Sequence, residues 1–157
     1  MDVAGLPLHP LIVHAVVVLT PLTVLALLLG TFWPGARRRL GIVTPLAALV
    51  VLVLVPITVN AGLALAEVIG PIPAVERHRQ LGEMLLPWAI ALFGIAAAQW
   101  AWYRWGDARV RERSPGAARA TAIVIGAAAV IVGIGATAMI VLIGDSGARA
   151  VWGGIVG

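Results

Sequence analysis

The segment LIVHAVVVLTPLTVLALLLGTFW, at residues Leu11–Trp33, decides the fold because it carries no Asp, Glu, Lys or Arg. A helix needs about 20 apolar residues to cross the hydrocarbon core of a bilayer, and this segment is long enough. Three further runs, Pro45–Ile69, Leu81–Tyr103 and Thr121–Ile143, also reach that length. The sequence therefore predicts an all-α integral membrane protein, built as a four-transmembrane-helix bundle.

The composition supports the same conclusion, because so little charge cannot cover a surface that faces water. The 157 residues are 61% hydrophobic and 11% charged, whereas a soluble domain carries about a quarter charged residues. We expect a single membrane domain over residues 1–157, with helices at about 9–33, 41–69, 75–104 and 120–143 and a short tail at 144–157. The chain has no cysteine, which excludes disulfides, thiolate metal ligands and iron–sulfur clusters held by cysteine.

Most arginines fall in two of the three predicted loops, and this asymmetry predicts how the chain crosses the membrane. Arg37–Arg39 follow the first predicted helix, and five more arginines lie at or after the end of the third, at positions 104, 109, 111, 113 and 119. The opposite side carries only Arg77, Arg79 and Arg149. Short arginine-rich loops stay in the cytoplasm, so both termini are expected outside. This bias explains the net charge of +4 without a nucleic-acid partner.

The three histidines of the chain all fall in the outer third of the predicted bundle, at His9, His14 and His78. A histidine within hydrocarbon needs a partner, and its two nitrogens allow one metal bond and one supporting hydrogen bond. His9 and His14 are five residues apart, so they point about 140° apart around a regular helix. We therefore expect His14 and His78 as the first-choice axial ligands of a b-type haem, with His9 next.

Other residues near the predicted outer rim complete the candidate site. Arg77, Arg79 and Arg149 are the candidates to bind haem propionates, because guanidinium pairs well with carboxylate. A divalent metal is the alternative cofactor, bound by the three histidines together with carboxylates. The candidate carboxylates are Glu67, Glu83 and Asp145.

A reading without any cofactor is also open. In that case each histidine bonds a carboxylate or a backbone carbonyl at the membrane interface. Arg79 already has Glu76 and Glu83 at the spacing of intrahelical ion pairs. The histidines and arginines would then stabilise the helix ends and bind nothing.

Two end motifs resemble one bacterial membrane family. They are LHPLIVH at Leu8–His14 and GDSGARAVW at Gly144–Trp152, with His78 opening the third helix between them. They are similar to the four-helix membrane family catalogued as domain of unknown function 2231, and the resemblance covers nearly the whole chain. It implies the four-helix fold and the outward-facing motif ends, and related domains joined to Rieske-type or cytochrome c modules favour electron transfer. We expect the chain in the bacterial cytoplasmic membrane.

One departure from that family affects the ligand set. Relatives often carry histidine where this chain has Asp145. If that histidine is a ligand, this chain has either lost it or replaced it with carboxylate oxygen. Carboxylate is a poor axial ligand for haem but a good one for zinc or manganese.

The sequence therefore predicts a small b-type cytochrome or redox subunit that meets a redox partner protein at the outer leaflet. The alternatives are a cofactor-free structural or accessory subunit and a divalent-metal-binding membrane protein. An independent enzyme is not expected, because no nucleophile–base pair, phosphate loop or two-carboxylate site is visible. Small residues at four-residue spacing, Ala122/Gly126 and Ala129/Gly133, would allow close approach to another helix, within the chain or in a homodimer.

Overall fold

The computed structural model describes residues 2–3, 6–70 and 72–153 of the chain. Within them, four helical segments are long and apolar enough to cross a membrane. They are α1 (Leu8–Phe32), α3 (Val43–Ile69), the joined helices α4 (Pro73–Glu83) and α5 (Leu85–Ala101), and α7 (Pro115–Trp152). The prediction of an all-α membrane protein with four transmembrane helices is confirmed.

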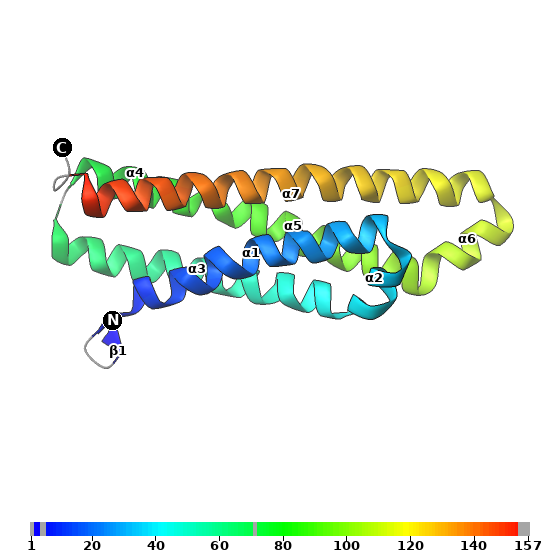
Figure 1. Ribbon diagram of the computed structural model, residues 1–157, viewed down its shortest axis with the longest axis horizontal. Helices are drawn as coiled ribbons and strands as arrows, with labels where there is room; N and C mark the ends of the chain where they lie inside the picture. Colours follow the sequence, from blue (N-terminus) through cyan, green and yellow to red (C-terminus); the bar gives the residue numbers. More distant parts are fainter. Residues whose placement is uncertain (1, 4–5, 71, 154–157) are drawn as a thin grey trace.

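The four segments form an up-and-down bundle in which α1 and α5 each pack on both α3 and α7. Figure 1 shows α1 beginning and α7 ending at the same end of the bundle, which we call the terminal end. Helix α2 (Pro34–Leu40), the π-helix η1 (Trp102–Gly106) and α6 (Asp107–Arg113) lie at the other end, which we call the arginine-rich end. Two short paired strands, β1 (Asp2–Val3) and β2 (Leu6–Pro7), precede α1.

Prolines and glycines set the breaks between the helices. Pro34, Pro73 and Pro115 each lie in the first turn of a helix, where no backbone amide is needed and the fixed φ suits the helix. Gly41 and Gly70 follow the ends of α2 and α3 with φ of 44° and 90°, a region that other residues rarely adopt. Local sequence therefore determines where the chain turns at both ends of the bundle.

Two boundaries differ from the sequence prediction. Helix α7 does not end near residue 143 but continues through Gly144 to Trp152, and residues 154–157 lie outside the described residues. The added turns pack on α4, and the buried side chain of Ser146 lies in that contact. The region predicted as a loop after residue 104 is also helical, in η1 and α6, and α6 packs on α7. Tertiary packing has extended the helices in both places.

The bundle interior holds two clusters of buried apolar side chains. The cluster nearer the terminal end includes Val55, and the cluster nearer the arginine-rich end includes Leu27 and Leu92. Trp88 of α5 packs against both clusters. Its indole ring fills the space beside Gly135 of α7, where an added Cβ would lie 1.9 Å from the ring atom Cζ3. The contact between α5 and α7 thus depends on a residue without a side chain.

The outer surface of the bundle is apolar as well. Large exposed hydrophobic side chains occur on each long helix, for example Leu22 and Leu25 on α1, Val53 on α3 and Ile131 and Ile134 on α7. Exposed apolar surface on this scale marks contact with another apolar phase, and spans of this length match the thickness of a bilayer. Lipid is therefore the medium around the middle of the bundle.

Candidate functional site: a histidine pair at the terminal end

His9 lies in the first turn of α1 and is held by α3. Its Nδ1 atom is 2.9 Å from the backbone oxygen of Thr58, and its ring lies against Gly62, where an added Cβ would be 3.0 Å from the ring. A carbonyl oxygen only accepts hydrogen bonds, so Nδ1 of His9 carries the hydrogen and donates it. In a neutral ring, Nε2 then keeps its lone pair.

His78 lies on α4 and is held in a similar way by α7. Its Nδ1 atom is 3.0 Å from Oγ of Ser146, and this hydroxyl donates its own hydrogen to the carbonyl of Ile143 at 2.9 Å. The hydroxyl must therefore accept from His78, so Nδ1 of His78 is also the donor. Gly147 leaves room for the ring, because an added Cβ there would be 3.1 Å from it. His78 has the same tautomer as His9.

The ring of His9 on α1 and the ring of His78 on α4 lie next to each other. Their centres are 6.1 Å apart, and their planes are almost perpendicular, at 84°. Both side chains are partly buried. We call His9 and His78 the histidine pair.

His14, which the sequence analysis placed first beside His78, has a different position. Its side chain is exposed, and its Nδ1 atom donates to the carbonyl of Pro10 in its own helix at 2.5 Å. The two histidines on α1 point in different directions, as their five-residue spacing predicts. In the described structure the ring beside His78 is that of His9, so the pairing of His14 with His78 is not the one that the helices bring together.

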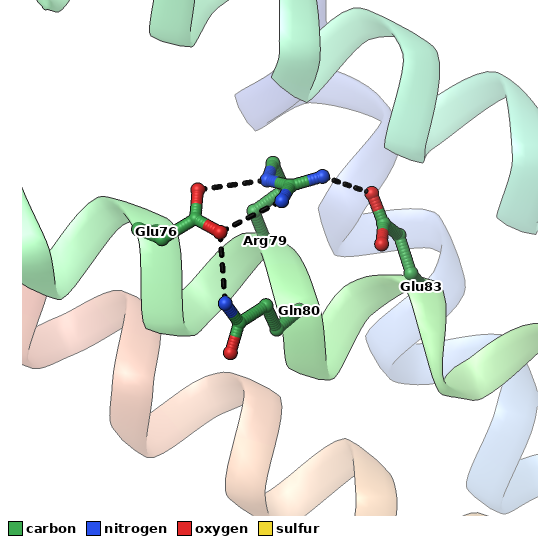
Figure 2. Close-up of polar contacts among 4 residues, drawn as sticks. All are labelled: Glu76, Arg79, Gln80 and Glu83. Carbon is green, nitrogen blue, oxygen red and sulfur yellow. Dashed lines mark hydrogen bonds and ion pairs between the residues drawn. The ribbon is translucent and has the colours of Figure 1, made fainter. Parts of the chain in front are cut away.

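The predicted arginine and carboxylate candidates bond mainly with one another. Figure 2 shows Arg79 between Glu76 and Glu83 on α4, with ion-pair distances of 2.7 and 2.5 Å, and Gln80 donating to Glu76. Arg149 pairs with Asp145 one turn away on α7, at 2.9 Å. These pairs are mostly exposed to solvent, and each is formed within one helix. They neutralise charge at the terminal end.

The predicted set of three histidines and three carboxylates is not gathered in one place. In the described part of the chain, no group of three His, Asp or Glu side chains has the spacing to bind a metal ion. Arg77 and Glu67 are exposed on α4 and α3. The structure instead brings together two imidazoles and two supporting oxygens, one from Thr58 and one from Ser146.

Four residues that hold the histidine pair were missed by the sequence analysis. They are Thr58, Gly62, Ser146 and Gly147. Ser146 and Gly147 lie within the quoted motif GDSGARAVW, so the motif itself was the available signal. Thr58 contributes through its backbone, which no side-chain pattern reveals.

Comparison with known proteins agrees with this architecture. No curated protein and no solved structure matches the chain. A family model described as "Predicted membrane protein (DUF2231)" matches residues 5–157, which includes every long helix of the bundle. The chain therefore belongs to the family of predicted membrane proteins DUF2231.

Proposed function

We propose that the protein binds one divalent transition-metal ion through the Nε2 atoms of His9 and His78. The observation that supports this most is the shared tautomer, because each Nδ1–H is donated to a fixed oxygen. Histidines that bind metals nearly always donate their second nitrogen in this way, which orients the ring and leaves the other lone pair for the ion. The histidine pair has this arrangement twice.

The separation of the rings supports a shared ion. Two imidazoles that each bind one ion at about 2.0–2.1 Å have ring centres about 5–6 Å apart. The observed distance of 6.1 Å is close to that range. The separation is therefore compatible with one ion between the rings, provided that each Nε2 atom is turned toward it.

The donor atoms limit which metals fit. Imidazole nitrogen suits zinc, copper, iron and nickel, and affinity for such a site is highest for copper. Water would complete the coordination, because Glu83 and Asp145 are engaged with arginines. Bound copper or iron could accept and donate one electron. The proposal therefore includes the predicted role as a redox subunit with a redox partner protein.

A b-type haem is the second candidate, since two histidines from different helices with this ring separation also suit one iron between them. The packing favours a single ion. The two rings already lie close against the neighbouring helices, because an added Cβ would be 3.0 Å from His9 at Gly62 and 3.1 Å from His78 at Gly147. Arg79 and Arg149 are already paired with carboxylates, so propionates would have to displace those.

The test is elemental analysis of the protein purified in mild detergent from cells supplied with copper, zinc and haem, with oxidised and reduced absorption spectra of the same sample. We expect about one metal ion per chain and no Soret band. A Soret band with sharp reduced α and β bands would show that the bound group is haem and not a single metal ion. A sample without metal or haem at good yield would contradict both and favour the cofactor-free structural or accessory subunit.

Substitution of Ser146 by alanine tests the supporting hydrogen bond. Loss of the hydroxyl removes the acceptor that fixes the tautomer of His78, so metal affinity should fall about 10–100-fold, as is typical for such partners. Titration with copper or zinc would measure it. Ser114→Ala is the matched control, because Ser114 caps the opposite end of α7. The metal affinity of this variant should stay unchanged.

Other predictions from the sequence stay predictions. The arginine bias still predicts that the terminal end faces outward from a bacterial cytoplasmic membrane. The small residues behind the homodimer prediction are used within the chain instead, since Ala129 and Gly133 are buried and Gly133 lies against Val24 of α1, so these residues do not support the homodimer.

A further inference from the structure

A second polar site lies at the arginine-rich end, far along the bundle from the histidine pair. It is a pocket of about 220 Å³ between the end of α1, α2, the start of α3 and the end of α5. Three arginines line it, Arg37, Arg38 and Arg104, together with the aromatic rings of Trp100 and Tyr103. Its described lining residues include no Asp or Glu. The pocket is therefore strongly positive.

Arg37 is fixed in this pocket before any ligand arrives. Its Nε donates to the carbonyl of Gly30 at 2.6 Å, and one terminal nitrogen donates to the carbonyl of Thr31 at 2.7 Å. Its guanidinium carbon lies 3.4 Å above the ring centre of Tyr103. These contacts satisfy the last carbonyls of α1 and add a cation–π interaction. The positive charge is thus held at one position.

The floor of the pocket is polar and buried. Gln99 is only 5% exposed, and its amide nitrogen donates to Oγ1 of Thr31 at 2.6 Å. Its amide oxygen lies close to Gly30, where an added Cβ would be 2.9 Å away. The buried amide of Gln99 is thus held in place between α1 and α5 and forms the floor of the pocket.

Arg38 and Arg104 complete the pocket from two directions. Both side chains are exposed, and the ion pairs of the described residues include neither of them. The nearest acid along the chain from Arg104, Asp107, pairs with Arg111 instead. Tyr103 and Arg104 reach the pocket from the π-helix η1, and π-helical turns often occur at functional sites.

We propose that this pocket binds the phosphate headgroup of an anionic phospholipid. Guanidinium groups match phosphate oxygens through paired hydrogen bonds, which the exposed Arg38 and Arg104 can supply, while the fixed Arg37 adds its positive charge. Exposed Trp33 and Trp105 lie at the same end of the bundle, and tryptophan is typical of the headgroup level of a membrane. Basic pockets between transmembrane helices bind acidic headgroups in other membrane proteins.

The test is native mass spectrometry of the full chain in mild detergent, titrated with phosphatidylglycerol or with phosphatidylcholine. We expect the first phosphatidylglycerol molecule to bind about tenfold more tightly than phosphatidylcholine. Replacing Arg38 and Arg104 together by glutamine should remove that preference. The matched control replaces Arg109 and Arg113 by glutamine, which removes the same charge from α6 outside the pocket, and it should keep the preference.

Three results would overturn the proposal. The first is equal binding of the two lipids by the unaltered protein. The second is an equal loss of the preference for phosphatidylglycerol in both double variants, which would indicate that the lipid is attracted by the overall charge of the protein. The third is displacement of the lipid by millimolar inorganic phosphate, because the ligand would then be a soluble phosphate. Arg37 is left intact in all variants, since it also holds the end of α1.

Discussion

Replacing His78 by alanine is expected to abolish metal binding, with a loss in affinity greater than about 100-fold. Removing a partner that only supports a ligand costs about 10–100-fold, and removing the ligand itself costs more. His9→Ala should cause a similar loss, because each residue supplies one of the two imidazoles of the histidine pair. Titration of the detergent-purified protein with copper or zinc would measure the change.

His14→Ala is the decisive control for this experiment. His14 is exposed and bonded within its own helix, so its removal should leave affinity unchanged. If His14→Ala instead lost binding while His9→Ala kept it, the pairing of His14 with His78 predicted from the sequence would be the correct one. The helical content of each variant, measured by circular dichroism, separates lost ligands from a lost fold.

Replacing Gly135 by alanine is expected to lower the free energy of unfolding by about 1–3 kcal/mol, the usual cost of overfilling a packed interior. The added Cβ would lie 1.9 Å from Cζ3 and 2.1 Å from Cη2 of Trp88, so the ring must move. That ring packs against both core clusters, and it cannot move without disturbing them. Unfolding of the detergent-purified protein with increasing dodecyl sulfate would measure the effect.

Two further variants make this prediction specific to the contact. Gly94→Ala is the matched control on α5, because no neighbouring side chain lies within 4 Å of an added Cβ there, and we expect the free energy of unfolding to stay the same or to rise by up to about 1 kcal/mol from the higher helix propensity of alanine. Combining Gly135→Ala with Trp88→Leu should cost less than the sum of the two changes, since the smaller side chain leaves space for the methyl group. Strict additivity would contradict the contact.

The sequence predicted the fold well because membrane spans depend on local composition. Long uncharged runs such as Leu11–Trp33 have few alternatives to a transmembrane helix, and prolines and glycines mark the turns. The end of α7 was predicted less well. Gly144 suits a helix end, but the contact of Ser146 with His78 continues the helix, and that contact joins residues far apart in the sequence.

The candidate site was predicted only in part, because it too depends on contacts between residues far apart in the sequence. The three histidines were identified and their end of the bundle was correct, but the partner of His78 depends on how α1 lies against α3. The carbonyl of Thr58 selects His9, and a backbone acceptor on another helix leaves no trace in the sequence. The pocket around Arg37 was also missed, because its arginines were counted only as a topology signal.

The length of α7 has a mechanical consequence. Its 38 residues span about 57 Å at 1.5 Å per residue, whereas the hydrocarbon core is about 30 Å thick. Even a strongly tilted rod of this length projects past the lipid tails. Its last turns, with the exposed Asp145–Arg149 pair, therefore form a rigid helical projection at the membrane surface. A protein that binds at the terminal end would therefore contact this projecting end of α7 beside the histidine pair.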